Sequence, residues 1–242
     1  MIVSHKHKFI FLKTRKTAGT SLEIFLSKFC SDDCIITHLY PHEEEIRLNH
    51  GGRIAQNCMK PWTQYGINDW LKLWKRRTLR RSIRVYSQHM HASNAKPLIG
   101  EEIWNSYFKF CFERNPWSKT VSDYHWKLIK EGTPDVSFEE YLERKNHRHI
   151  DWNTYTINNR IEVDYIGRYE HLSEDLRYVC ERIGIPYEDR LPSAKKFKAT
   201  KRDYKNYYSD AQIEHVARMF HKEINAFGYR FEDSGSSLPF IA

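Results

Sequence analysis

The stretch 13–21 (KTRKTAGTS) combines residue types that bind phosphate groups. It lies between a β-forming run and an amphipathic helical pattern, so we expect a strand–loop–helix unit. Backbone N–H groups and the helix dipole attract an anion at such a place. Gly19 lets the backbone approach a ligand, and Lys16 can reach the bound group. We predict a phosphate site made of Lys13, Arg15, Lys16, Thr17, Ala18, Gly19, Thr20 and Ser21.

The order of these residues differs from the Walker A motif, in which the lysine follows the last glycine. Here Lys16 precedes Gly19. The alternative interpretation is an ordinary strand–helix turn with a solvated lysine.

A second constellation is Arg114-Asn-Pro-Trp-Ser118, directly after the strongest β-forming run, 107–113 (YFKFCFE). Ligands of parallel sheets bind outside the carboxyl ends of the strands, so Arg114 should open into the same crevice as Lys16. Ser122, eight residues after Arg114, can face the same phosphate. Taken singly, a surface arginine and a helix-capping serine would be the simpler interpretation.

Two histidines follow a third β-forming run, 83–87 (IRVYS), in the sequence QHMHAS. An imidazole at the carboxyl end of a strand is well placed to act as a general base. His89 and His91 are both candidates for this base. Because the chain has 13 histidines, the simpler interpretation of either one is a surface residue without a catalytic role.

Strand and helix patterns alternate along the chain, which predicts one α/β domain with a mainly parallel sheet. The apolar spacing of Leu22, Phe25, Leu26 and Phe29 predicts a helix capped by Thr20 or Ser21. Further strands are expected at 83–87, 107–113 and 161–169, and further helices in 96–107, 118–132, 137–144, 172–184 and 209–228. Pro116 fits a first helical turn, Ser173 and Ser209 fit N-caps, and Gly184 and Gly228 fit helix ends.

The segment 38–80 is expected to be a variable insertion within a single domain covering 1–242. We interpret 38–66 as an exposed loop and 67–80 as a helix, capped by Asn68 or Asp69, with Trp70, Leu71 and Trp74 directed inward.

Composition indicates an anionic partner. The 242 residues carry a formal net charge of +8, with 40% hydrophobic and 14% aromatic residues, so general disorder is not expected. No apolar run approaches the 18 residues that span a bilayer, and no signal peptide is recognised. The five cysteines are few and odd in number, which argues against a disulfide framework and favours a cytoplasmic protein.

In this order, the motifs KTAGTS, QHMHAS and RNPWSKTVS resemble the sulfotransferases that use 3′-phosphoadenosine 5′-phosphosulfate (PAPS). IGRYEHLSEDL and the final YYSDAQIEHVARMFHKEINAFGYRF are similar to the carbohydrate-type, Golgi-related branch and its bacterial relatives in sulfotransferase family 2. The resemblance covers most of 8–231 in outline. It implies a P-loop-like nucleotide-binding core and no metal. Golgi members carry a membrane anchor, whereas none is recognised in this sequence.

The resemblance also implies a role for each candidate residue. Backbone groups of 17–21 would hold the 5′-phosphate, and Lys16 would steady the bridging oxygen. Arg114 and Ser122 would hold the 3′-phosphate, and Lys201 or Arg202 could also touch it. His91 would take the proton of the acceptor hydroxyl; we place it ahead of His89. The acceptor would be a carbohydrate, placed on the side of the 38–80 insertion.

Rival interpretations remain open. A nucleotide kinase or NTPase would share a phosphate loop but lacks the Walker A order. A nucleic-acid or membrane-facing module would use the seven basic residues of 72–84, although it leaves the KTAGTS and RNPW loops unexplained. Docking of an anionic acceptor or a merely solvated face would also account for 72–84. A metal site at Cys30, Cys34, His38 and His42 is not expected, because Pro41 and the β-type CIIT run interrupt the helical spacing.

Overall fold

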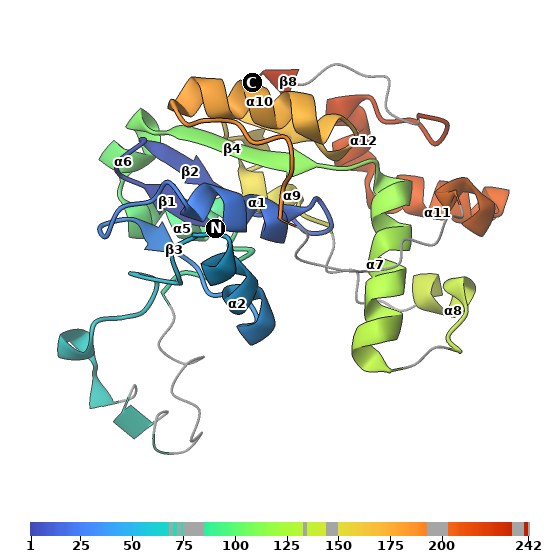
Figure 1. Cartoon of the computed structure of the whole chain (residues 1–242). Coiled ribbons are helices and arrows are strands. Elements are labelled where there is room, and N and C mark those ends of the chain that lie inside the picture. The colour runs from blue at the N-terminus through green and yellow to red at the C-terminus, as the bar shows by residue number, and fades with distance from the viewer. Residues whose placement is uncertain are drawn as a thin grey trace.

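The computed structural model describes residues 1–67, 70–71, 74, 85–132, 135–143, 150–192, 203–233 and 240–241. Its centre is a six-stranded sheet in the order β3-β1-β2-β4-β7-β8 (Figure 1). The strands are β1 (Ile2–Ser4), β2 (Phe9–Phe11), β3 (Ile35–Ile36), β4 (Phe108–Glu113), β7 (Tyr165–Arg168) and β8 (Phe240–Ile241). A separate hairpin pairs β5 (Thr156–Ile157) with β6 (Arg160–Ile161).

The three strands at the centre of the sheet are parallel. Phe11 of β2 pairs with Phe110 of β4, and Phe112 of β4 pairs with Gly167 of β7. The short strands β1, β3 and β8 run antiparallel to their neighbours. The α/β class and the parallel core expected from the sequence are therefore confirmed.

Both faces of the sheet are covered, which explains why its strands read as continuous apolar runs. The helices are α1 (Gly19–Ser27), α2 (Pro41–Asn49), α5 (Ala92–Ile99), α6 (Glu101–Ser106), α7 (Pro116–Glu131), α8 (Phe138–Glu143), α9 (Trp152–Tyr155), α10 (Leu172–Ile183), α11 (Asp210–Met219) and α12 (His221–Phe227). Phe9 and Phe11 pack on one face of the sheet with α1 and α10, whereas Ile10 and Leu12 pack on the other with α5, α6 and α7. Short 3₁₀ turns lie at Trp62–Gln64, Tyr169–His171 and Tyr204–Tyr207.

Several local predictions are confirmed. Pro116 occupies the first turn of α7, and Gly184 and Gly228 end α10 and α12 in the left-handed conformation. Ser209 forms the expected N-cap of α11, as part of a capping box with Gln212.

Other local predictions are wrong. The N-cap position of α1 is Ala18 and not the expected Thr20 or Ser21. The N-cap position of α10 is His171 and not the expected Ser173. The expected C-terminal helix is divided into α11 and α12 at Phe220, whose backbone leaves the helical region. Val85 to Ser87 form a bend and a coil rather than a strand; 83 and 84 lie outside the described residues.

The segment 38–66 also differs from expectation, because it contains α2. Tyr40 and Glu43 form a capping box, and Pro41 begins the helix. Most of 67–80, with Asn68 and Asp69, lies outside the described residues. Trp70, Leu71 and Trp74 are described, and their side chains are 56%, 48% and 80% exposed rather than directed inward.

Candidate functional site

The segment 13–21, which leads from β2 into α1, is called the cradle below. Lys16 and Ala18 have positive φ angles of 63° and 57°, and α1 starts at Gly19 directly after them. A Cβ atom at Gly19 would lie 2.9 Å from Cγ of Lys13, so the close approach requires glycine. The hydroxyl of Thr14 donates to the carbonyl of Phe112, which fastens the loop to β4.

The loop after β4 lies against this cradle. The guanidinium of Arg114 donates to the carbonyl of Lys16 (3.1 Å) and to Oγ of Ser118 (2.8 and 3.0 Å). Its Cζ atom is 4.2 Å from the centroid of the Tyr169 ring. Asn115 caps α7 by accepting hydrogen bonds from the backbone of Trp117 and Ser118. The two motifs singled out in the sequence therefore meet at the carboxyl ends of neighbouring parallel strands.

A cavity of about 540 Å³ opens between the two loops. Ala18 and Ser21 line it from the cradle, and Asn115 and Ser118 line it from the Arg114 loop. The remaining lining residues are Tyr169, Glu170, Leu172, Leu191, Pro192, Tyr204 and Asp233. Lys16, Arg114 and Ser122 are not among the lining residues. Ser122 follows Ser118 by one turn on the same side of α7.

The sequence did not single out these remaining lining residues of the cavity. Tyr169, Glu170 and Leu172 belong to the IGRYEHLSEDL stretch, which carried the family resemblance and was the available signal. Leu191, Pro192, Tyr204 and Asp233 lie in no recognised motif. Lys201 and Arg202, which were predicted to touch a phosphate, lie outside the described residues.

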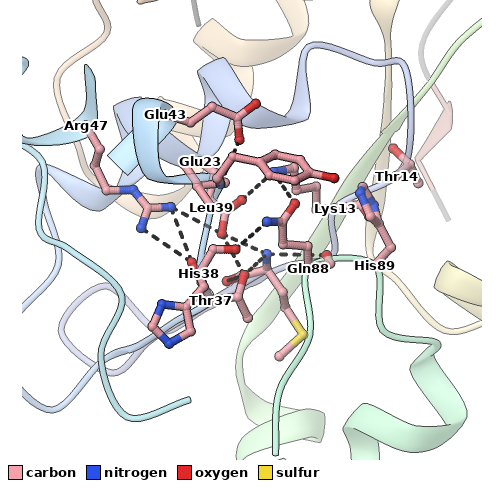
Figure 2. Close-up of polar contacts among 12 residues, drawn as sticks. Lys13, Thr14, Glu23, Thr37, His38, Leu39, Glu43, Arg47, Gln88 and His89 are labelled. Carbon is pink, nitrogen blue, oxygen red and sulfur yellow. Dashed lines mark hydrogen bonds and ion pairs between the residues drawn. The ribbon is translucent and has the colours of Figure 1, made fainter. Parts of the chain in front are cut away.

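Behind the cradle is a buried charge cluster (Figure 2). The carboxylate of Glu23 on α1 pairs with Nζ of Lys13 (2.7 Å) and with the guanidinium of Arg47 (3.5 Å), and it accepts from the hydroxyl of Thr37 (2.7 Å). Burial alone would raise the pKa of Glu23, but the cations of Lys13 and Arg47 help to lower it to about 2. Lys13 was predicted to contact the nucleotide; its side chain is only 3% exposed, and its ammonium is bonded within this cluster.

Lys13 also positions the histidine segment. Its Nζ donates to Oε1 of Gln88 (3.3 Å), and its carbonyl lies 2.8 Å from Nδ1 of His89. A carbonyl only accepts, so Nδ1 of His89 carries the proton and Nε2 is left with its lone pair. Burial, with the nearby cations of Lys13 and Arg15, lowers the pKa of His89 to about 3. His91, in contrast, has an exposed side chain at the N-terminus of α5.

A second buried charge network links the two loops. The carboxylate of Asp151 accepts from the backbone N–H (2.7 Å) and Nη1 (2.8 Å) of Arg15, and it pairs with Nζ of Lys119 (2.9 Å). Lys119 also pairs with Glu113 (2.9 Å), whose Oε2 accepts from the backbone N–H of Arg114 (3.1 Å). Burial raises the pKa of Glu113 to about 7, although Lys119 opposes the shift. Asp151 carried no signal in the sequence.

Lys16 lies at the edge of the cradle, with its Nζ 5.2 Å from the centroid of the Trp126 ring on α7. Within the described ranges, no cluster of three or more His, Cys, Asp or Glu side chains is arranged to hold a metal ion. No helix in the same part of the chain has the length and apolar character needed to cross a bilayer.

Residues 1–230 match the Sulfotransferase family, and the chain therefore belongs to this family of enzymes. The family resemblance read from the sequence is confirmed.

Individual relatives are distant. The chain is 36% identical over 94 residues to an uncharacterized protein of Archaeoglobus fulgidus, a match covering 37% of this chain and 78% of the relative. It is 25% identical to carbohydrate sulfotransferase 10 of Xenopus laevis and 28% identical to carbohydrate sulfotransferase 14 of Danio rerio. These matches cover 59% and 42% of this chain but only 55% and 37% of the two sulfotransferases. No solved structure matches the chain significantly.

Proposed function

We propose that the protein transfers a sulfuryl group from PAPS to a hydroxyl group of a carbohydrate. The observation that carries this proposal is the cavity shared by the 13–21 cradle and the Arg114 loop. Each loop brings donors for one phosphate group, and the cavity lies between them. A nucleotide phosphorylated at both its 3′ and 5′ positions suits this arrangement better than one with a single chain of phosphates.

The residues present fit such a nucleotide. The first turn of α1 has N–H groups without intrahelical partners, and these favour a phosphate at the cavity wall. The glycine at position 19 keeps the cradle compact, since a side chain there would collide with Lys13. The guanidinium of Arg114 has the fork geometry that holds phosphate oxygens, and Tyr169 supports it from one side.

When bound, PAPS supplies an activated sulfuryl group whose transfer needs alignment and charge stabilisation more than covalent help from the protein. Lys16 supplies the positive charge next to the cradle. Arg114, with Ser118 and Ser122 on the same side of α7, holds the 3′-phosphate and so fixes the position of the nucleotide.

We assign the general base to His91, as the resemblance implies. Its side chain is exposed and can meet an acceptor that arrives from solvent. His89 is less suited, because a pKa of about 3 makes it a weak base. Its contact with the carbonyl of Lys13 instead makes it a residue that holds the histidine segment against the cradle.

The carbohydrate acceptor is supported by the relatives, two of which are named carbohydrate sulfotransferases. The test is transfer of labelled sulfate from PAPS to desulfated polysaccharides, neutral oligosaccharides and a simple phenol, with Lys16→Ala as the inactive control. We expect label on at least one carbohydrate. Label on the phenol alone would contradict the acceptor class. Turnover of ATP without sulfate transfer would support the kinase alternative.

A further inference from the structure

We propose that Asp151 is a positioning residue that sets the 5′-phosphate cradle from outside the nucleotide cavity. Asp151 precedes α9 and is 136 positions from Arg15. Its side chain is fully buried, and both of its carboxylate oxygens are bonded. It does not line the cavity, so its influence on a nucleotide must pass through its partners. The inference rests on the proposed function in one respect, the identity of the ligand.

The contact with the backbone gives Asp151 control of the loop conformation. Its Oδ2 accepts the N–H of Arg15 at 2.7 Å, directly before Lys16, the first residue of the 13–21 cradle with a positive φ angle. A left-handed conformation at a residue other than glycine persists only where its surroundings enforce it. Asp151 therefore fixes the point at which the chain turns toward Lys16 and the start of α1.

The same carboxylate is charge-balanced from both sides. Lys119 has no exposed surface and lies 2.9 Å away, and the Arg15 guanidinium lies 2.8 Å away. Burial would raise the pKa of Asp151, but these cations hold it below its ordinary value, so the carboxylate stays ionised. Lys119 also bridges Asp151 to Glu113, and thus to the residue before Arg114. One buried chain of charges joins the two phosphate loops.

The test compares Asp151→Asn with the unaltered protein in binding adenosine 3′,5′-bisphosphate and adenosine 3′-phosphate by calorimetry. A hydrogen bond to a charged group accounts for roughly a factor of 10 to 100 in an equilibrium constant. We expect the bisphosphate to weaken at least about tenfold, and the 3′-phosphate to change less than about threefold. A merely structural role would weaken both nucleotides alike, and a loss of negative charge alone would strengthen both.

Asp164→Asn is the matched control. Asp164 accepts the backbone N–H of Lys109 (2.7 Å) and pairs with its Nζ (2.9 Å), the same pattern as Asp151 with Arg15, at the opposite end of β4 from Arg114. It should leave the ratio of the two affinities unchanged.

Equal weakening, or strengthening, of both nucleotides in Asp151→Asn would overturn the inference. A second measurement does not depend on the variant folding. The amide proton of Arg15 should exchange slowly with solvent in the unaltered protein without ligand, and exchange at the unprotected rate would also overturn it. Failure of the unaltered protein to bind the bisphosphate would overturn the proposed function as well, so the two failures are distinguishable.

Discussion

The guanidinium of Arg114 donates to the backbone carbonyl of Lys16 over 3.1 Å, although the two residues are 98 positions apart in the sequence. The contact joins the loop after β4 to the loop after β2. It gives Arg114 two possible roles, as a ligand of the 3′-phosphate and as a support of the 5′-phosphate cradle.

Replacing Arg114 separates these roles. Arg114→Lys keeps the positive charge but loses the fork that reaches Ser118 and the Lys16 carbonyl together. We expect adenosine 3′,5′-bisphosphate to bind at least about tenfold more weakly, from the loss of hydrogen bonds to a charged group. Adenosine 5′-phosphate should weaken less. Calorimetry with both nucleotides checks this, and equal weakening would mean that Arg114 acts only as a support of the cradle.

Gly19→Ala should damage the cradle. The added Cβ would lie 2.9 Å from Cγ of Lys13 and 3.2 Å from the carbonyl of Thr14. Overpacking of this kind costs about 1–3 kcal/mol of the free energy of unfolding. Urea denaturation should show that loss, and bisphosphate binding should weaken with it.

Gly184→Ala is the control for this change. Gly184 also resists a side chain, because its φ is +67°, but its Cβ would meet nothing within 4 Å and it lies at the end of α10. It should lose stability and keep its nucleotide affinity. A Gly19→Ala protein with normal stability and affinity would contradict the cradle geometry.

The two histidines should differ in their effects. His91→Ala should lose roughly 10²–10⁴-fold in turnover, the usual contribution of a general base, and keep its affinity for the bisphosphate. His89→Ala should lose both, because its ring contacts the Lys13 carbonyl behind the cradle.

His221→Ala, whose exposed ring contacts a carbonyl of its own chain segment, should change neither turnover nor affinity. A fully active His91→Ala protein beside an inactive His89→Ala protein with normal affinity would move the base to His89.

His89 also makes stability depend on pH. Its folded pKa of about 3 is below its ordinary 6.5, so only the unfolded chain binds a proton between these values. Stability from this group is complete above pH 6.5 and is lost as the pH falls toward 3. His89→Gln can donate to the same carbonyl without titrating. Within that window, each unit by which the pH falls should lower the free energy of unfolding of the unaltered protein, relative to that of His89→Gln, by at most about 1.4 kcal/mol. Parallel pH profiles would contradict a half-buried His89 that stays neutral.

The strand–loop–helix around 13–21 and the strand before Arg114 could be predicted because their signals are local. Apolar runs, a glycine and a first-turn proline fix these elements whatever surrounds them. The helix α2 could not, since its cap is a tyrosine and its buried Arg47 depends on Glu23 in another helix. Asp151 gave no signal for the same reason: its partners are brought together only by the fold. Helical spacing suggested a buried face for Trp70 and Trp74, but spacing does not show whether another element covers it.

The most direct test of the central claim is which nucleotide the protein prefers. Thermal unfolding should be measured with adenosine 3′,5′-bisphosphate, adenosine 5′-phosphate and ATP at equal concentration, with and without Mg²⁺. A ligand that binds only the folded state raises the melting temperature, and at equal concentration the tighter ligand raises it more. We predict a large shift with the bisphosphate, independent of Mg²⁺, and small shifts with the other two. An equal or larger shift with ATP, or a shift that requires Mg²⁺, would contradict a site built for two separate phosphate groups.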